Sequence, residues 1–137
     1  MDVDHDKLVA LAGFRAALRR FLAFSEEATI EAGITSQQYQ ALLAIGAAKG
    51  AALTLGALAQ ELLLKANAAV QLVDRLAAQD LVTRTRDEGD RRSVRIALTP
   101  KGRALLVKLA GLHLDQLSRR KKQFADILRR LKQTQAD

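Results

Sequence analysis

The sequence predicts a mainly α-helical chain that carries one small β-hairpin. Apolar residues recur at three- and four-residue steps over most of the chain, which is the period of amphipathic helices. The period changes to two only over residues 81–98, as is typical of strands. Directly before this change, two short helical segments follow each other almost without a break. The expected fold class is therefore mainly α with a small β-wing, in which a winged helix-turn-helix is flanked by N- and C-terminal helices.

The first helix is expected to run from Asp6 to about Ala32, a stretch without proline. Its apolar stripe consists of Leu8, Leu11, Phe14, Leu18, Phe21 and Leu22. A second helix should begin after Thr35, because Thr35 and Gln38 have the spacing of a capping box, in which each side chain accepts a hydrogen bond from the other residue's backbone. Gly50 is expected to end this helix.

The two short helices in the middle have the spacing of a helix-turn-helix. The first follows Thr54 and should direct inward Leu55, Leu58, Ala59 and Leu62. The second begins two or three residues later and should bury Ala69, Leu72, Val73 and Leu76. Its outward face offers Asn67, Gln71 and either Arg75 or Asp74, with Lys65 at its entrance.

A β-hairpin is expected directly after these helices. Residues 81–86 and 93–98 alternate between two faces, and the segment DEGDRR between them contains Gly89, which can take the positive φ of a hairpin loop. From Pro100, which follows the capping residue Thr99, the chain should be helical to its end, with a break near the run SRRKKQ. Helix, turn, helix and hairpin in this order are the elements of a winged helix.

The net charge of +7 is concentrated towards the C-terminal end. Residues 1–64 hold 5 lysines and arginines against 7 acidic residues, whereas residues 96–137 hold 10 against 3. A basic surplus of this kind favours a polyanionic partner. The absence of cysteine excludes disulfides and thiol chemistry. Because the chain has no long apolar run and starts with the acidic MDVDHD, we expect neither a membrane span nor a secretory leader, and we expect a cytoplasmic protein.

The outward face of the second short helix suits the major groove of double-stranded DNA. Short amide side chains such as Asn67 and Gln71 can pair with adenine there. Small residues would permit close approach and contact with thymine methyl groups, and the candidates are Ala66, Ala68 and Ala69. Taken alone, Asn67 and Gln71 fit an ordinary exposed helix equally well. The order of the elements, two short helices followed directly by a hairpin, favours the interpretation that these residues contact DNA.

The charged hairpin tip suits the phosphates of the same duplex. It would lie over a phosphate ridge or place an arginine in the minor groove. Asp87 or Asp90, paired with Arg91 or Arg92, would hold those arginines in position before DNA arrives. An isolated hairpin with such a tip is more often plain solvated surface, so this interpretation depends on the adjacent helix-turn-helix.

An enzyme is not expected. His5 and His113 are the only imidazoles, they lie far apart without ligand spacing, and we interpret both as surface or interface residues. The sequence has no phosphate-binding glycine loop, no nucleophile elbow and no paired carboxylates in an apolar setting. We therefore expect no catalytic residue, no metal and no cofactor.

Both ends of the chain carry leucine and phenylalanine stripes that are wider than one small wing domain can cover. Exposed apolar area of this extent needs a partner surface, which predicts a homodimer. The alternative is that the two ends pack on each other within one chain. In a twofold dimer the two recognition helices would lie one DNA turn apart, about 34 Å.

Residues 72–106, LVDRLAAQDLVTRTRDEGDRRSVRIALTPKGRALL, resemble the signature of the MarR (multiple antibiotic resistance regulator) family. The similar pieces are LVDRL at the end of the recognition helix, LVxR at the start of the wing, DxxDRR at its tip and LTxxG at the start of the next helix. Upstream, ITSQQYQALLAI and LTLGALAQEL also fit the family's second and third helices. The resemblance covers essentially the whole chain.

The resemblance implies a homodimeric transcription regulator that forms a single domain over residues 1–137 and binds a pseudo-palindromic operator. Residues of about 1–33 and 100–137 would be the dimerisation helices, and residues of about 34–99 the DNA-binding region. It implies DNA contacts from the recognition-helix residues Lys65, Asn67, Ala68, Gln71 and Arg75. It also implies wing arginines Arg91 and Arg92, with Arg84 and Arg86 at the base of the wing and Asp87 and Asp90 as orienting acids.

Many proteins of this family release DNA when a small aromatic or phenolic acid binds, so the resemblance further implies a repressor with a small-molecule effector. No residue is assigned to an effector pocket. The chain departs from the family pattern in having Lys65 at the start of the recognition helix, where Ser or Thr is common, and Gln71 near its middle, where Arg is common. Two alternatives stay open, namely a winged helix that binds proteins and a DNA-binding protein without an effector.

Overall fold

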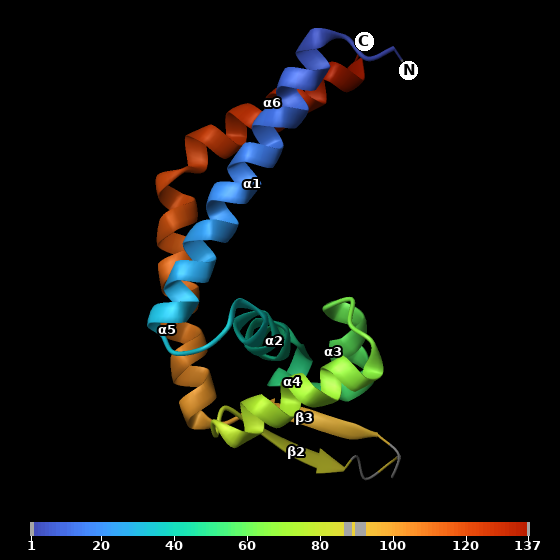
Figure 1. Cartoon of the computed structure of the whole chain (residues 1–137), viewed down its shortest axis with the longest axis vertical. Coiled ribbons are helices and arrows are strands. Elements are labelled where there is room, and N and C mark those ends of the chain that lie inside the picture. The colour runs from blue at the N-terminus through green and yellow to red at the C-terminus, as the bar shows by residue number, and fades with distance from the viewer. Residues whose placement is uncertain (1, 87–88, 90–92, 137) are drawn as a thin grey trace. The chain divides into compact units, whose positions relative to one another are not determined.

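The computed structural model describes residues 2–86, 89 and 93–136, and the chain divides into two compact units. Unit 1 consists of residues 1–28 and 111–137, and unit 2 of residues 29–110. Figure 1 shows the elements in chain order: α1 (His5–Glu31), α2 (Ser36–Ala47), the short 3-10 helix η1 (Lys49–Ala51), β1 (Ala52–Thr54), α3 (Leu55–Glu61), α4 (Ala66–Ala78), β2 (Val82–Arg86), β3 (Val94–Leu98), α5 (Pro100–Arg119) and α6 (Lys121–Ala136). The expected fold class, mainly α with a small β-wing, is confirmed. No helix in the described part of the chain is long and apolar enough to cross a membrane.

Unit 2 contains the helix-turn-helix and an antiparallel sheet of three strands in the order β1-β3-β2. The β2–β3 hairpin was expected, and its register pairs Val82 with Leu98 and Arg86 with Val94. β1 was not expected, because its three residues are too few to show an alternating pattern. It pairs with β3 on the side opposite β2, so β3 is the central strand of the wing sheet.

The turn between α3 and α4 has four residues, 62–65, rather than the two or three that the sequence suggested. α3 ends early because Leu63 adopts a left-handed backbone conformation with φ 56°. The amide of Leu64 then donates to the carbonyl of Ala59 over 2.8 Å, which closes the helix end. Leu63 itself is 93 % exposed, so this backbone turn and not side-chain packing sets the start of α4.

The core of unit 2 joins α2, α3 and α4 to the sheet. α2 contacts β3 and α3, and α4 contacts α3 and β2. The largest fully buried side chains of these elements are Leu42, Ile45, Leu58, Leu76 and Ile96. The predicted capping box at the start of α2 is confirmed, since the Thr35 amide donates to Gln38 Oε1 over 2.9 Å and the Gln38 amide to Thr35 Oγ1 over 3.1 Å. Burial also raises the pKa of the Tyr39 phenol.

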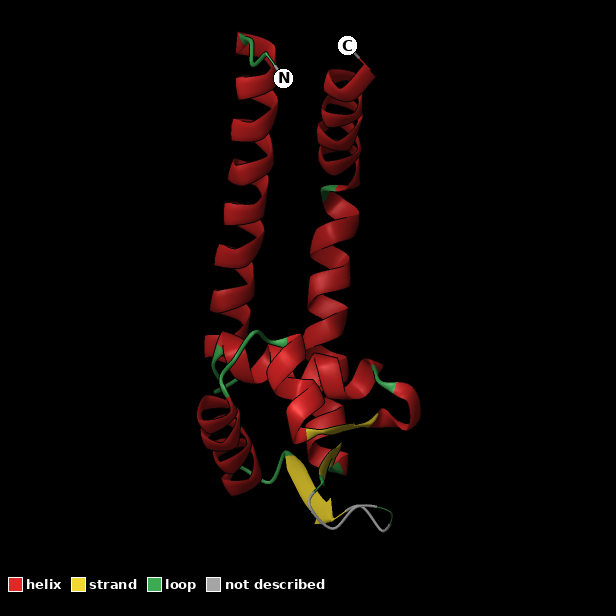
Figure 2. Ribbon diagram, turned by 90° about the vertical axis from the view of Figure 1, so that its right-hand side faces the viewer, coloured by secondary structure: helices red, strands yellow, loops and turns green. Residues whose placement is uncertain are grey.

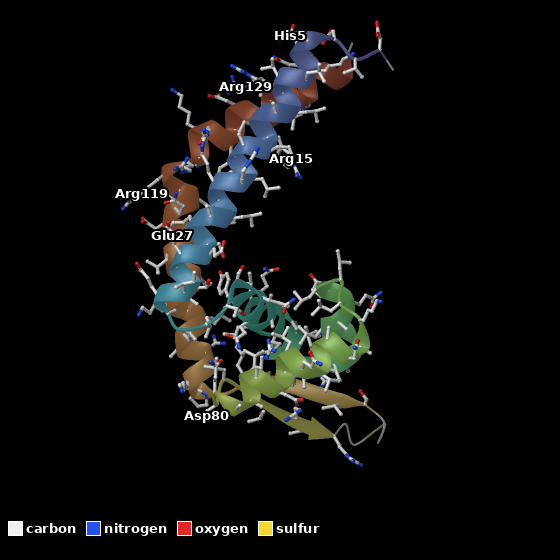
Figure 3. All side chains as sticks on the ribbon, in the orientation of Figure 1. His5, Arg15, Glu27, Asp80, Arg119 and Arg129 are labelled. Carbon is white, nitrogen blue, oxygen red and sulfur yellow. The ribbon has the colours of Figure 1, made fainter. Side chains whose placement is uncertain are left out.

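A compact corner fixes the base of the β2–β3 hairpin to the end of α4. The Thr99 amide donates to the carbonyl of Leu81 over 3.1 Å, and its hydroxyl donates to the carbonyl of Asp80 over 2.6 Å. The same hydroxyl accepts the Gly102 amide over 2.9 Å, so Thr99 caps α5 as predicted. Figure 3 labels Asp80 at this corner, where α4 gives way to β2.

Unit 1 is built from the two ends of the chain. Both Figure 1 and Figure 2 show α1 running alongside the C-terminal helices within this unit. His113 of α5 is 6 % exposed, and its Nε2 lies 2.8 Å from the hydroxyl of the buried Ser25 of α1. The rings of Phe21 and Phe24 meet the imidazole edge-on at 5.9 and 5.5 Å between centroids. The helix is interrupted at Arg120, between α5 and α6, within the run where a helix break was expected.

Candidate nucleic-acid interface

α4 is anchored by one face and exposed on the other. The residues of its inner face are at most 4 % exposed, and they are Ala69, Leu72, Val73 and Leu76, as the sequence predicted. The residues on the opposite side are all exposed, and we call them the reading face: Ala66, Asn67, Val70, Gln71, Asp74 and Arg75. Because the inner residues are fixed by the core, the reading face has a defined orientation within unit 2.

The structure brings most of the predicted recognition-helix residues onto or beside this face. Asn67, Gln71 and Arg75 belong to it, and Lys65 is exposed directly before the first turn of α4. Ala68 is half-buried at its border. Ala69 was expected to approach DNA closely, and this expectation was wrong: Ala69 is 0 % exposed because it lies on the core face.

Val70 is a residue of the reading face that sequence reasoning missed. It is 39 % exposed although it is apolar, and it lies one turn after Ala66 and one turn before Asp74. An isolated valine in a helix is usually assigned to the core, which hides this position in the sequence. The signal that could have found it is the four-residue spacing from Ala66 to Val70 to Asp74, which puts all three on one row.

An ion pair connects the reading face to the wing. The Arg84 guanidinium of β2 donates a hydrogen bond to the Asp74 carboxylate of α4, and both side chains are about half-exposed. This pair explains why the outward helix face can carry an acid: Asp74 is neutralised by an arginine of the adjacent strand. It also brings Arg84, expected at the base of the wing, directly beside the reading face. Arg86 is exposed one step further towards the wing tip.

The wing tip itself was predicted to carry the orienting acids Asp87 and Asp90 and the arginines Arg91 and Arg92. All four lie outside the described residues. Their roles stay predictions from the sequence. The pairing of β2 with β3 extends towards the tip as far as Arg86, which lies opposite Val94.

Two exposed arginines of unit 1 are engaged in ion pairs within their own helices. Figure 3 labels both of them, together with Arg15 of α1 on the other side of the view. Arg119 pairs with Asp115 over 3.2 Å, and Arg129 pairs with Asp126. The basic run SRRKK thus spans the end of α5, the turn residue Arg120 and the start of α6.

His113 was expected to be a surface or interface residue, and this was wrong: it is an interior residue of unit 1 and is 6 % exposed. Ser25, Phe21 and Phe24 contact His113, and none of these three side chains is a usual metal ligand. Over residues 2–86, 89 and 93–136, no three histidines or acids come together in a way that could hold a metal ion.

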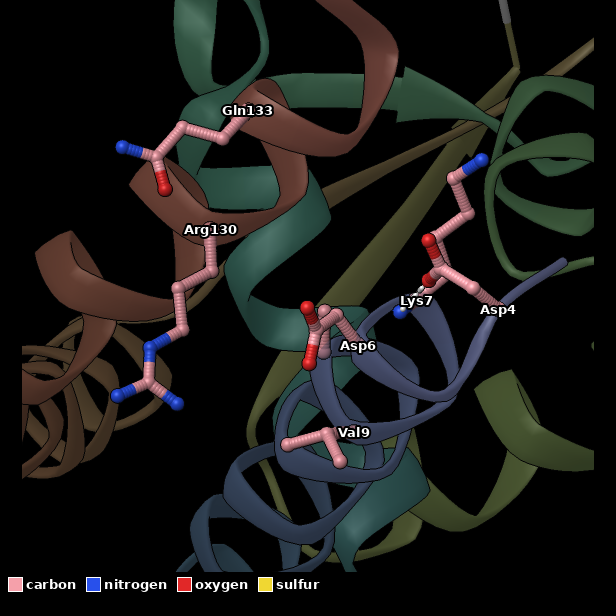
Figure 4. A pocket seen from close by; sticks show the side chains of 7 residues that line it. Asp4, Asp6, Lys7, Val9, Arg130 and Gln133 are labelled. Carbon is pink, nitrogen blue, oxygen red and sulfur yellow. Dashed lines mark hydrogen bonds between the residues drawn. The ribbon is translucent and has the colours of Figure 1, made fainter. Parts of the chain in front are cut away.

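A pocket of about 300 Å³ lies in unit 1 between the start of α1 and α6 (Figure 4). Asp4, Asp6 and Val9 line it on one side, and Arg130 and Gln133 on the other. A neighbouring pocket of about 280 Å³ shares Val9 and Arg130. The first volume is at the lower limit of the range for small-molecule sites, and the second is just below it. Their linings mix acidic and basic groups.

A helix-turn-helix with an anchored, outward-facing second helix and an adjoining antiparallel hairpin defines the winged helix-turn-helix class. Residues 32–93 match the sequence model of the MarR family, a segment that includes α2, α3, α4 and β2. The resemblance to the MarR family that was found in the sequence is therefore confirmed over this segment.

Several solved structures have the same fold. AbsC, a MarR family transcriptional regulator from Streptomyces coelicolor, is similar with a TM-score of 0.76 at 20 % identity, over 93 % of this chain and 84 % of that one. A MepR–DNA complex from S. aureus has a TM-score of 0.67 at 21 % identity, over 88 % of this chain and 97 % of that one. A mutant MarR from E. coli complexed with operator DNA has a TM-score of 0.69 at 21 % identity, over 96 % and 99 %. No curated protein sequence matches the chain.

Proposed function

We propose that this protein is a homodimeric, DNA-binding transcription regulator. The observation that carries the proposal is the reading face of α4, which is exposed, largely polar and held by a buried core inside a MarR-family segment. The DNA complexes of MepR and of the E. coli MarR mutant, which share this fold, support it. On this proposal the reading helix enters the major groove and contacts DNA through Lys65, Asn67, Ala68, Gln71 and Arg75.

The wing contributes contacts to the DNA backbone or the minor groove in this proposal. Arg91 and Arg92 act at its tip and Arg84 and Arg86 at its base, while Asp87 and Asp90 orient the tip arginines. The ion pair between Arg84 and Asp74 supports the part of this proposal that concerns the base, because it holds that guanidinium beside the reading face.

The regulator acts as a repressor in the cytoplasm, and a small aromatic or phenolic acid releases it from a pseudo-palindromic operator. Residues of about 1–33 and 100–137 pair two copies, and residues of about 34–99 bind DNA. The large exposed apolar side chains of unit 1 support the pairing, and they are Val3, Leu8, Val9, Leu11, Phe14, Leu22, Leu112, Leu114, Leu117 and Leu128. Soluble proteins rarely leave so many on one small unit without a partner surface.

A salt titration of duplex binding tests the proposed function. We expect affinity for a mixed-sequence duplex to fall steeply between about 50 and 200 mM salt, because each phosphate neutralised by the protein releases counterions. Arg91→Ala and Arg92→Ala should each weaken binding to all duplexes and reduce the slope of log affinity against log salt by about 0.9. Fluorescence anisotropy of a labelled duplex measures both quantities.

Arg119→Ala is the matched control, since Arg119 is an exposed arginine of unit 1. It should leave the slope unchanged, and all three variants should unfold at the same urea concentration as the parent protein. Absent or salt-insensitive duplex binding would contradict the proposal and favour a winged helix that binds proteins. Unchanged affinity in both wing variants would contradict the role of the tip.

Asp74→Asn should strengthen binding to a mixed-sequence duplex by about fivefold at low salt. The substitution removes a negative charge that faces the phosphates and frees Arg84 to contact them, and one such charge is worth about 1 kcal/mol at short range in water. Asp115→Asn breaks the exposed pair with Arg119 in α5 and serves as the control. Equal affinities of Asp74→Asn and the parent protein would show that α4 does not approach the phosphates.

A further inference from the structure

The reading face of α4 has two chemically different edges. Ala66 and Val70 lie one helical turn apart on one edge, and Asn67 and Gln71 lie one turn apart on the other. All four are exposed. Neither amide side chain forms a hydrogen bond with another part of the described chain, so both amides are available to a ligand of this face.

Charged groups occupy only the two ends of this face. Lys65 precedes the first turn, and Arg75 lies in the last turn. The Asp74 carboxylate forms an ion pair with Arg84 of the wing. In the major groove, arginine and lysine read guanine, asparagine and glutamine read the N6 and N7 atoms of adenine, and apolar side chains contact the methyl group of thymine. The first two turns of the reading face therefore carry the chemistry that recognises adenine and thymine and none of the chemistry that recognises guanine.

Building on the proposed function, we propose that the central base pairs of each operator half-site are A·T pairs read from both edges of α4. Asn67 and Gln71 bind the adenine edges, and Ala66 and Val70 contact the thymine methyl groups. Each A·T pair presents both features in the major groove, the adenine N7 and N6 beside the thymine methyl group. Val70, which has no charge and no hydrogen-bonding side chain, is thus a specificity-determining residue.

The test starts with selection of bound sequences from random duplexes, which should return half-sites with A·T pairs at their centre. Each central thymidine of the selected duplex is then replaced by deoxyuridine, which lacks only the methyl group. We expect each contacted methyl group to change affinity by about fourfold, the value of burying one such group. In Val70→Ala the same replacement at the position that Val70 contacts should cost nothing.

Two controls separate specificity from general effects. Val107→Ala makes the same change at an exposed valine of α5 and should keep the full penalty for deoxyuridine. Asn67→Ala should reduce the preference for adenine over guanine by about tenfold, within the range for a bidentate contact. If the protein binds duplexes in a salt-sensitive manner but selects G·C pairs, or binds deoxyuridine as tightly as thymidine, the inference is overturned and the proposed function stands. If no duplex is bound at any salt concentration, both are overturned.

Discussion

Gly102→Ala should destabilise the protein by about 3 kcal/mol, at the upper end of the cost of overpacking a core. A Cβ atom at this position would lie 2.0 Å from the carbonyl oxygen of Leu81 and 2.9 Å from its carbonyl carbon. The backbone of Leu81 cannot move away, because the same carbonyl accepts the Thr99 amide and the Leu81 side chain is buried. Urea denaturation followed by circular dichroism measures the loss.

Two other glycines of unit 2 make a graded control. At Gly56 in α3 a Cβ atom meets nothing within 4 Å, so Gly56→Ala should stabilise the protein by about 0.5–1 kcal/mol through its better helix propensity. At Gly46 a Cβ atom would lie 2.4 Å from the Cδ2 atom of Leu106, the far end of a flexible side chain, so Gly46→Ala should fall between the other two. If Gly102→Ala and Gly56→Ala unfold at the same urea midpoint, the backbone of Leu81 moves to accommodate the added Cβ atom, and the prediction for Gly102→Ala is wrong.

Local chemistry made much of unit 2 predictable from the sequence. The capping box of Thr35 and Gln38 and the cap at Thr99 involve residues three positions apart, so their hydrogen bonds can be read from the spacing alone. The buried face of α4 follows in the same way from the helical period. The motif LTxxG was identified in the sequence only as a piece of the family signature. The structure adds its reason, since Thr99 caps α5 and Gly102 lies against the Leu81 backbone.

Features that depend on residues distant in the chain were not predictable. β1 exists because Leu53 pairs with Ile96, which lies 43 positions later. The three residues of this strand contain no pattern that would predict a strand. The expectation for His113 failed because its partner Ser25 lies 88 positions away. Arg84 was assigned to DNA alone, whereas its contact with Asp74 ties the wing to α4. In each case the residue could be singled out in the sequence, but the residue that it contacts could not be predicted.

The reading face of α4 depends on both kinds of information. Periodicity predicts which side of the helix is exposed, but the exposed fraction of Val70 and the engagement of Asp74 come from the packing of α4 against α3 and β2. Because Asp74 forms an ion pair with Arg84, the outward face carries less negative charge in the folded chain than its sequence suggests. With Asp74 neutralised, the amides of Asn67 and Gln71 are the dominant polar groups of the first two turns of the face.

Leu11→Asp should convert the proposed dimer into monomers. Leu11 is 53 % exposed on α1, in a row with Leu8, Phe14 and Leu22, each of which is about half-exposed. If this row lies in the interface between two copies, an aspartate there would bury an unpaired charge, which costs several kcal/mol. A penalty of about 3 kcal/mol raises the dissociation constant of the dimer by about a hundredfold. Sedimentation at micromolar concentration measures it.

The same variant should lose affinity for a duplex with two half-sites by about a hundredfold or more, because a monomer cannot hold both half-sites at once. Ala23→Asp is the matched control: it introduces the same charge at an exposed position of α1 that lies three or four residues from none of the residues in this row. Since both positions are exposed in the single chain, both variants should keep the folded protomer, as thermal unfolding would verify. If Leu11→Asp sediments as a dimer, or if Ala23→Asp dissociates equally, the row on α1 is not the surface that pairs two copies.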